Sequence, residues 1–340
     1  MSNEKFYNAL NRIPQNCPPI WFMRQAGRYH KHYQNLRSKH SFIELCKNPK
    51  LAAEVALGPI EDFDFDVSIM FSDLLFPLEA LGMGLEYSPG PKLNWHLNET
   101  NISKLLDPNL AAKDLEFQKE VLIETRRRLP AEKSLIGFVG GAWTLFTYAV
   151  EGGHNGNMIK SKSSLGLWGS FNEHLLPLLK QNIKWQLDGG AEIVIIFDTS
   201  AGTLSSDLFA ELVVPTLQLL ANEFPGKLGY YGKPLTTDHY ALLQNDKLFL
   251  AGMGFDHRFS MSSALQLNNK GFSQGNFDQS LLFLDHDNFA KTLAKYLQPL
   301  SELSPEKRKG WVCGLGHGVL PQTPEENVHY FVKTLRSMFS

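Results

Sequence analysis

The sequence predicts an α/β protein built as a single (β/α)8 barrel, and three observations indicate that fold class. Short apolar runs that end in polar clusters recur eight times along the 340 residues, and stretches with helical periodicity lie between them. Such runs are typical of parallel strands that are buried on both faces. No repeat or linker divides the chain, so we expect one domain over residues 1–340, with a doubly wound sheet as the alternative architecture.

Each expected strand is one of these apolar runs. The clearest covers residues 192–197, which read EIVIIF and are mostly β-branched. In chain order the runs are 19–23, 66–71, 134–139, 192–197, 227–231, 248–253, 271–274 and 311–315. Segment 82–97 interrupts the order, and we expect it to be an inserted hairpin-like excursion with SPGPK, residues 88–92, as its turn.

Five of the intervening stretches carry apolar residues at spacings of three and four, the period of a helix with one buried face. They are 109–129, 164–187, 206–223, 287–301 and 324–338. The last begins with Pro324, Glu325 and Glu326, a favourable helix start because proline suits the first turn and acids suit the positive end of the helix dipole.

Composition excludes several classes of protein. Apolar residues make up 43% of the chain and charged residues 20%, with a formal net charge of −2. A disordered chain is excluded, and we expect neither nucleic acid nor a membrane as a partner, because no overall charge attracts them and no apolar run approaches the ~18 residues of a membrane span. The N-terminus resembles neither a signal nor a transit peptide. Three cysteines without a CxxC pair fit a reducing, cytoplasmic location.

Polar side chains follow the expected strands, as a barrel requires, because chemistry in this fold is at the carboxyl ends of the strands. These residues are Arg24, Arg28, Ser72, Asp73, residues 140–144, Asp198, Thr199, Lys233, Asp256, Asn276, Asp278 and His317.

Motifs for common cofactors are missing from the chain. No GxxxxGK[ST] or HExxH occurs, and neither GLGHG (314–318) nor GMGFD (252–256) has the third glycine of a dinucleotide fingerprint. We interpret the pair His30 and His32, which lies in a polar stretch, as a surface feature. The sequence therefore predicts no metal site.

The segment WFMRQAGRY, residues 21–29, is the most informative. Two guanidiniums, those of Arg24 and Arg28, leave the same loop, and Arg37 follows nine residues later. Guanidiniums bind carboxylates through two parallel hydrogen bonds. From composition alone, an anion site and a set of structural ion pairs are equally good interpretations.

Three further residues are candidates at strand ends. Asp73 closes the run IMFSD and is interpreted either as a site carboxylate or as a helix cap. Tyr148 follows a glycine-rich stretch that lets the backbone approach a ligand, although a tight strand–helix junction explains the glycines equally well. His317 lies between two glycines, so its ring is open to approach.

Taken together, these segments resemble the uroporphyrinogen decarboxylase family of tetrapyrrole biosynthesis. The resemblance rests on PPIWFMRQAGRY (18–29), FSD (71–73), GFVGGAWTLFTYAVEG (137–152), IFDTSAGTLS (196–205), QGNFD (274–278) and GLGHGVLPQTPEENV (314–328). It extends over nearly the full length, and it implies a single (β/α)8 barrel that works without metal or organic cofactor, usually as a homodimer.

The resemblance also implies a reaction and a set of site residues. Family members remove CO2 from the four acetate side chains of uroporphyrinogen III to give coproporphyrinogen III. Asp73, Arg24 and Tyr148 would be catalytic, with Asp73 stabilising a transient positive charge on a pyrrole ring and Arg24 as a candidate proton donor. The residues expected to bind substrate are Arg24, Gln25, Arg28, Arg37, Asp73, Tyr148, Thr199 and His317.

Some positions depart from the family pattern. His30, Lys31 and His32 replace Leu-Pro-Glu, Ala142 replaces a proline, Thr199 a serine, Gly314 an asparagine, and Gln279 stands where proline is preferred. The alternative function is a zinc-dependent, cobalamin-linked methyltransferase of the same fold group. That function needs a thiolate-type metal set, and Cys313 near His317 is the single Cys–His proximity along the chain.

Overall fold

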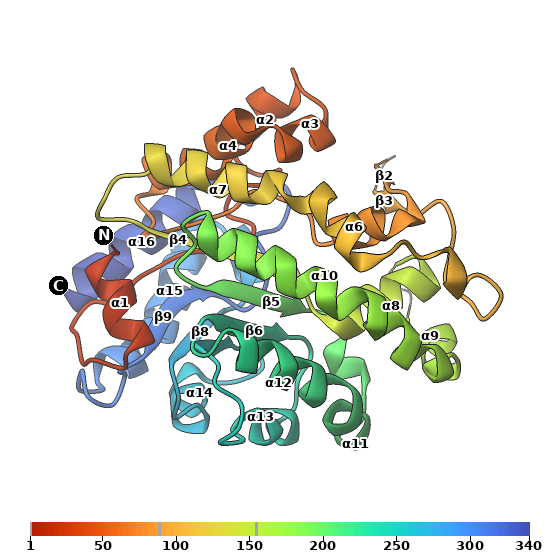
Figure 1. Ribbon diagram of the computed structural model, residues 1–340. Helices are drawn as coiled ribbons and strands as arrows, with labels where there is room; N and C mark the ends of the chain where they lie inside the picture. Colours follow the sequence, from red (N-terminus) through yellow and green to blue (C-terminus); the bar gives the residue numbers. More distant parts are fainter. Residues whose placement is uncertain (1, 88–89, 154–155) are drawn as a thin grey trace. The chain divides into compact units, whose positions relative to one another are not determined.

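The computed structural model describes residues 2–87, 90–153 and 156–340. Seven strands form a parallel sheet in the order β1-β4-β5-β6-β7-β8-β9, and β2 and β3 form a separate antiparallel pair (Figure 1). The strands are β1 (Val67–Ile69), β2 (Glu86–Tyr87), β3 (Pro91–Lys92), β4 (Ser134–Gly140), β5 (Val194–Asp198), β6 (Leu228–Gly232), β7 (Gly252–Gly254), β8 (Phe272–Phe277) and β9 (Trp311–Leu315).

Helices connect and flank the strands. The α-helices are α1 (Glu4–Leu10), α2 (Lys31–Arg37), α3 (Phe42–Lys47), α4 (Pro49–Phe63), α5 (Phe76–Leu78), α6 (Pro108–Ala112), α7 (Phe117–Arg128), α8 (Ala142–Glu151), α9 (Ile159–Ser163), α10 (Trp168–Asp188), α11 (Ser206–Leu208), α12 (Val214–Glu223), α13 (Thr237–Leu243), α14 (Met261–Leu267), α15 (His286–Ser301) and α16 (Glu325–Phe339). Short 3-10 or π segments are η1 (Glu79–Met83), η2 (Ile102–Lys104), η3 (Lys113–Leu115), η4 (Leu165–Leu167), η5 (Ala201–Thr203), η6 (Phe209–Val213) and η7 (Gln279–Phe283).

The chain forms two compact units, and the boundary between them crosses β4. The first unit comprises Met1–Phe71, Glu124–Ile136 and Leu250–Ser340, and the second comprises Ser72–Ile123 and Gly137–Phe249. In the first unit, β1 pairs with the start of β4, and β7, β8 and β9 pair in sequence. In the second unit, the end of β4, β5 and β6 pair in sequence. The prediction of a parallel α/β sheet is therefore confirmed.

The first expected strand differs from the others. Residues 19–23 form a single parallel bridge, Ile20 to Cys313, rather than a regular strand. The backbone of this segment is nevertheless bonded on two sides, since Cys313 N donates to Pro19 O at 2.8 Å and Asp66 N donates to Ile20 O at 2.9 Å. Pro18 and Pro19 have no N–H group, so the segment cannot make a full ladder of hydrogen bonds. The closed eight-stranded barrel stays a prediction.

Two of the expected helices are interrupted. Residues 109–129 fold as α6, a 3-10 turn and α7, and residues 206–223 fold as α11, a π segment and α12. Pro215, near the start of α12, supplies no N–H, which accounts for the wider π turn just before it. The stretch 164–187 corresponds mainly to α10, and 287–301 and 324–338 correspond to α15 and α16.

The inserted excursion at 82–97 is a hairpin, as predicted. Glu86 pairs with Lys92, and Tyr87 with Pro91, in antiparallel register. Of its expected turn, residues 88–89 lie outside the described part of the chain.

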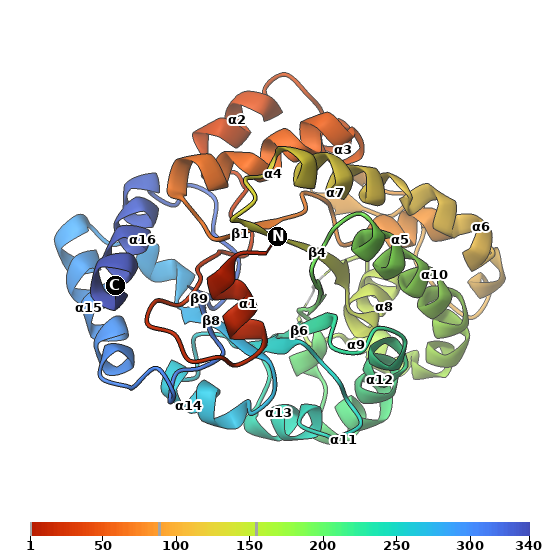
Figure 2. The ribbon, with the colours of Figure 1, turned by 60° about the vertical axis from the view of Figure 1, so that its left-hand side comes forward.

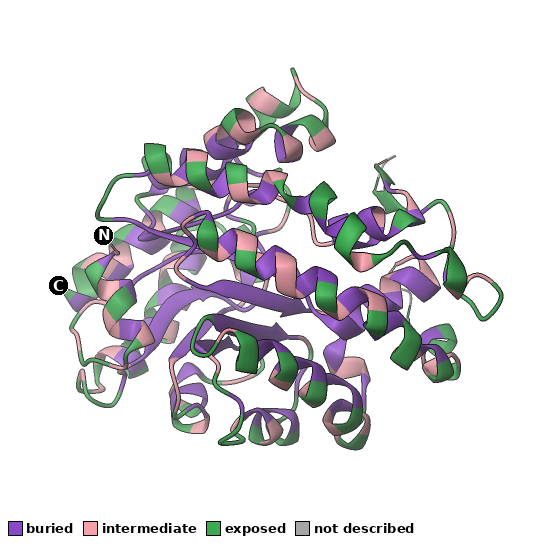
Figure 3. Cartoon of the chain, viewed as in Figure 1, coloured by how far each residue is buried: buried purple, intermediate pink, exposed green. Residues whose placement is uncertain are grey.

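Burial follows the alternation of strands and helices. The strands of the sheet are buried apart from Phe138 of β4, which is partly exposed, whereas the longer helices bury one face and expose the other (Figure 3). In α16 the buried face carries Val328, Phe331, Val332, Leu335 and Phe339, and this helix lies beside α15 (Figure 2). No described helix is long and apolar enough to cross a membrane. The three cysteines, all described, form no disulfide.

Asp66 joins several elements of the first unit. Its carboxylate is almost fully buried, accepts the N–H of Ile20 at 2.9 Å, and pairs with Arg336 of α16 at 3.4 Å and Lys5 of α1 at 3.6 Å. Its backbone carbonyl accepts the N–H of Ser134 at the start of β4 at 3.0 Å. One buried carboxylate therefore fixes the Ile20 segment, α1 and α16 to the start of β1.

We predict that Asp66→Ala lowers the free energy of unfolding by about 3 kcal/mol, because it leaves the buried N–H of Ile20 without its acceptor and leaves Arg336 with Asp64 as its one remaining carboxylate among the ion pairs of the described residues. Urea unfolding followed by circular dichroism measures the effect. The control is Glu306→Ala, which removes an exposed pair with Lys309 and is expected to cost within ~0.5 kcal/mol. Equal effects of the two substitutions would contradict this role of Asp66.

Candidate active site

The arginine-bearing loop begins where the Ile20 segment ends, and Gln25 holds it in place. The Gln25 side chain is buried, its Oε1 accepts the N–H of Phe22 at 3.1 Å, and its Nε2 donates to the carbonyl of Val67 in β1 at 3.1 Å. Both ends of the amide are thus bonded to backbone. This geometry makes Gln25 a residue that positions the loop, and its expected contact with substrate stays a prediction.

Arg24 lies where this loop meets the segment after β9. Arg24 has a left-handed backbone with φ of 62°, a conformation that is uncommon for residues other than glycine and that often occurs at functional sites. The N–H of Val319 donates to the carbonyl of Met23 at 2.9 Å. A Cβ atom at Gly318 would lie 2.5 Å from Arg24 Cδ, so the Arg24 side chain crosses this glycine. The structure therefore brings Arg24 beside the segment that carries His317.

Arg28 and Arg37 are both exposed and both lie near the buried phenol of Tyr33. Burial raises the pKa of Tyr33, and the positive charges of Arg37 and Arg28 oppose that rise. Arg37 also donates to the carbonyl of His40 at 2.9 Å. Neither guanidinium has a carboxylate within ion-pair distance among the pairs between described residues, which favours the anion-site interpretation of this loop over structural ion pairs.

The departure at Gly314 has a steric explanation. A Cβ atom at this position of β9 would lie 2.4 Å from Nε2 of Gln274 and 2.7 Å from the carbonyl oxygen of Trp21. The Gln274 side chain therefore occupies the space that a larger residue at 314 would need, and its Nε2 is buried without a hydrogen-bond partner in the described part of the chain.

Asp73 lies in the second unit, four residues after the end of β1 and just before α5. Its Oδ1 accepts the N–H of Leu75 at 2.8 Å, which is a turn of the kind that aspartate commonly forms two residues ahead of itself. The side chain is partly exposed. The N-cap of α5 is Leu75, so Asp73 forms a turn before the helix rather than a helix cap, and this contact is compatible with a role in a site.

Tyr148 and Thr199 lie on segments that a buried carboxylate holds together. Asp198, the last residue of β5, accepts from Thr144 N at 2.8 Å and from Thr144 Oγ1 at 2.6 Å. The same Oγ1 accepts the N–H of Ser200 at 3.0 Å. These bonds fix the start of α8 to the end of β5, so Thr199 lies beside the first turn of α8 and Tyr148 follows one turn later.

Asp198 is the residue whose importance the sequence did not indicate. Full burial raises its pKa from 3.8 to about 6, although hydrogen bonds from Thr144 and Tyr230 oppose the shift. Its Oδ2 accepts from the Tyr230 hydroxyl at 3.3 Å. The strand-end position was visible in the sequence, but the partners that surround it come from α8 and β6 and were not.

The prediction that His30 lies on the surface is wrong. The His30 side chain is only 2% exposed, because it packs against Phe63, whereas Lys31 is exposed and His32 is partly exposed. Among the described residues, one group of side chains has the spacing to hold a metal ion, and it comprises His30, Asp62 and Glu325.

The structure therefore brings some of the predicted site residues together within each of the two units. Arg24 and the His317 segment meet in the first unit, where Arg28 and Arg37 both flank Tyr33. In the second unit the Asp198 hydrogen bonds bring the segments of Tyr148 and Thr199 together.

Comparison with known proteins gives a consistent result. The sequence model of the family described as "Uroporphyrinogen decarboxylase (URO-D)" matches residues 1–338. Uroporphyrinogen decarboxylase of Helicobacter hepaticus is 36% identical, covering 97% of this chain and 98% of that protein. The enzyme of that name from Pelodictyon phaeoclathratiforme is 33% identical, with 99% and 98% coverage. Among solved structures, a methyltransferase from Methanosarcina mazei matches with a TM-score of 0.78 at 17% identity, covering 99% of each chain, which indicates a shared fold.

We predict that Asp198 makes stability depend on pH between about 4 and 6. The folded state keeps a proton on this carboxyl that the unfolded chain releases near pH 3.8, so folding stability is greatest below that pH and falls as pH rises through about 6. The loss is roughly 3 kcal/mol for a shift of this size.

Asp198→Asn removes this titration while it keeps an oxygen that can accept from Thr144. Chemical denaturation at pH 4 and pH 7.5 is expected to show a decline in the free energy of unfolding that is smaller in Asp198→Asn than in the native protein. Asp188→Asn, which changes an exposed carboxylate on α10, is the control. An identical pH dependence in the native protein and Asp198→Asn would contradict the assignment.

Proposed function

The chain belongs to the uroporphyrinogen decarboxylase family, and from that premise we propose that it converts uroporphyrinogen III to coproporphyrinogen III by removing CO2 from four acetate side chains. The observation that carries the proposal is the match of the family model over residues 1–338, together with relatives of that name that align over nearly their whole length. The reaction is that of a carboxy-lyase that uses no cofactor.

The reaction needs an acceptor for the electron pair that CO2 leaves behind, and the pyrrole ring of the substrate can provide it. A proton added to a ring carbon creates a cationic, iminium-like ring. The carbon–carbon bond to the carboxylate then breaks, CO2 leaves, and the electron pair neutralises the ring as an exocyclic alkene. A second proton on the former acetate carbon, with loss of the first proton from the ring, gives the methyl group of the product.

In this mechanism Asp73 supplies the fixed negative charge. Its carboxylate would accept the pyrrole N–H groups and stabilise the transient positive charge, and charge placed in advance of the reaction is a large source of rate acceleration. Its hydrogen bond from Leu75 at 2.8 Å supports the proposal because it restrains the carboxylate. Arg24 is proposed as a proton donor, and Tyr148 as a catalytic hydrogen-bonding group.

The exposed guanidiniums fit a substrate with eight carboxylates. We assign Arg24, Arg28 and Arg37 to these carboxylates, each charge-assisted bond contributing about 1.5–3 kcal/mol. Gln25, Thr199 and His317 are the remaining residues proposed to bind substrate.

The wider organisation follows from the same proposal. The chain would act as one domain with the closed (β/α)8 form, as a homodimer in the cytoplasm. The parallel sheet and the fold shared with the Methanosarcina mazei protein support the barrel form, and three cysteines that form no disulfide fit the cytoplasm, whereas the homodimer is proposed from the family resemblance alone.

The alternative, a zinc-dependent methyltransferase, receives less support. It requires a deprotonated cysteine as a metal ligand, but Cys313 is fully buried and burial holds the pKa of its thiol well above the usual value. Similarity to the Methanosarcina mazei structure at 17% identity concerns the fold alone.

The proposed activity is tested by anaerobic incubation of the chelator-treated protein with uroporphyrinogen III. Chromatography is expected to show products with seven, six, five and four carboxylates in the presence of chelator. A reaction that needs added Zn2+, or the absence of any product, would contradict the proposal.

Substitutions of Asp73 test the mechanism. Asp73→Asn keeps the size and the acceptor for Leu75 but loses the charge, so we predict a fall in turnover of about 10²–10³-fold, or ~3–4 kcal/mol. Asp73→Glu keeps the charge but displaces it, which alone costs about 10²-fold. Both variants are expected to fold, with Asn less active than Glu, and the measurement is the initial rate of CO2 release.

The control is the substrate KM of each variant, which is expected to change less than turnover because the arginines are retained. Turnover of Asp73→Asn close to that of the native protein would leave Asp73 with its structural role before α5 alone.

A further inference from the structure

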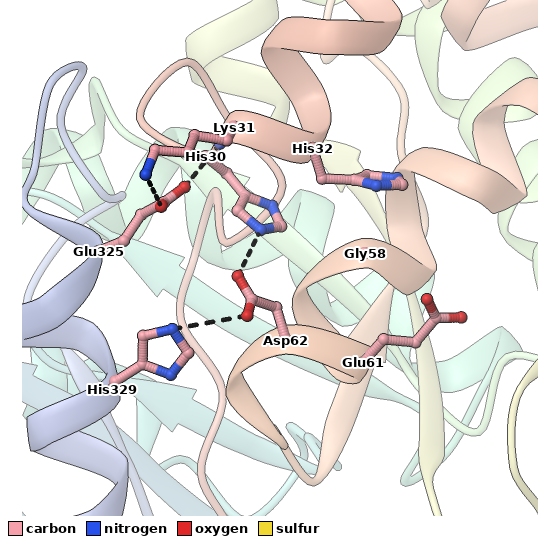
Figure 4. A pocket seen from close by; sticks show the side chains of 8 residues that line it. All are labelled: His30, Lys31, His32, Gly58, Glu61, Asp62, Glu325 and His329. Carbon is pink, nitrogen blue, oxygen red and sulfur yellow. Dashed lines mark hydrogen bonds and ion pairs between the residues drawn. The ribbon is translucent and has the colours of Figure 1, made fainter.

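A pocket in the first unit is formed where α2, α4 and α16 meet, and none of its lining residues is assigned to the decarboxylation. It has a volume of about 500 Å3, and its polar lining comes from the start of α2, the last turn of α4 and the start of α16 (Figure 4). Its chemistry is that of imidazoles and carboxylates, which is the donor set of transition-metal sites in proteins.

The donor atoms are close together. His30 Nε2 lies 3.0 Å from Asp62 Oδ2, and His329 Nε2 lies 3.5 Å from the other oxygen of the same carboxylate (Figure 4). One ligand atom each from His30, Asp62 and Glu325 lie within 4.8 Å of one another. Ligands about 2.1 Å from a tetrahedral ion lie roughly 3.4 Å apart, so small side-chain movements bring these atoms to coordination distance.

Packing fixes the orientation of both imidazoles. The ring of Phe63 packs against each of them, with centroids 5.0 Å from His30 and 4.6 Å from His329. The His30 side chain is only 2% exposed, so the packing around it restrains its ring. Its Nδ1 has no hydrogen-bond partner in the described part of the chain, so Nε2 makes the ring's polar contact.

The excess of negatively charged side chains that line the pocket also favours binding of a cation. Three carboxylates line it, those of Glu61, Asp62 and Glu325, against the single ammonium of Lys31. Lys31 Nζ lies 3.7 Å from Glu325 and its side chain is 84% exposed, so this pair contributes little and is readily displaced. Glu325 is oriented independently, because its Oε1 accepts the backbone N–H of Lys31 at 2.6 Å.

We propose that this pocket binds one divalent first-row transition-metal ion, with His30, Asp62 and Glu325 as its protein ligands and His329, 3.5 Å from Asp62, as the residue that orients the Asp62 carboxylate. Imidazole and carboxylate ligands of this number suit Zn2+, Ni2+ or Co2+ and exclude a site built for Ca2+ or Mg2+, which prefer oxygen ligands alone. The site joins α2, the C-terminal end of α4 and the start of α16, so the bound ion stabilises the fold and takes no part in the decarboxylation.

Zinc binding by the chelator-treated full chain tests the proposal. In a competition titration against a chromophoric chelator, we expect one Zn2+ per chain and a rise in the thermal unfolding midpoint when the ion is bound. Asp62→Asn and His329→Gln are expected to weaken Zn2+ affinity at least tenfold. Both residues are exposed enough to be replaced without unfolding, which circular dichroism checks.

Two matched controls lie in the same pocket. Glu61→Gln makes the same charge change as Asp62→Asn one residue earlier on α4, and His32→Gln replaces a histidine whose ring contacts Glu54 instead. Both are expected to keep Zn2+ affinity within about twofold of the native protein. Co2+ provides a further readout, since ligation by nitrogen and carboxylate in a tetrahedral site gives visible absorption much stronger than that of the aqueous ion.

The proposal is overturned if no Zn2+ binds, if Asp62→Asn binds as the native protein does, or if Glu61→Gln weakens binding as much as Asp62→Asn. Because these measurements use no substrate, they are independent of the outcome of the decarboxylation assay.

Discussion

The buried carboxylate of Asp66 is the contact on which the arginine-bearing loop depends. Pro18 and Pro19 have no N–H group, so the first apolar run cannot form the regular backbone hydrogen bonds of a strand. The Asp66 side chain instead accepts the N–H of Ile20 at 2.9 Å. The loop that follows is tied to β1 a second time by the Gln25 amide. The positions of Arg24 and Arg28 thus depend on two side chains that need not touch any ligand themselves.

A second buried carboxylate has a comparable role in the second unit. Asp198 joins the end of β5 to the start of α8 through Thr144, and its burial raises the pKa of the carboxyl to about 6. Ionising this buried group at neutral pH lowers the free energy of unfolding. Its hydrogen bonds nevertheless hold the segments that carry Tyr148 and Thr199 in one arrangement. Conformational restraint of this kind is what preorganised electrostatic catalysis requires.

The sequence predicted the parallel sheet well because buried parallel strands have a local signature, the continuous apolar run. It predicted the family because MRQAGRY and its companion segments are specific. It did not predict the irregular first strand, where proline competes with the apolar pattern, or the π segment before Pro215. It placed His30 at the surface because a polar neighbourhood in sequence says nothing of Phe63, against which the ring packs in the fold.

The proposed mechanism depends most directly on Asp73 as the group that faces the pyrrole nitrogens. The measurement that tests it is a crystal structure of the protein with coproporphyrinogen III bound. We expect both Asp73 oxygens to lie within hydrogen-bond distance of pyrrole N–H groups, with propionate carboxylates on the guanidiniums of Arg24, Arg28 or Arg37. A tetrapyrrole bound with Asp73 directed only at Leu75 and no ring nitrogen near it would contradict the proposed mechanism.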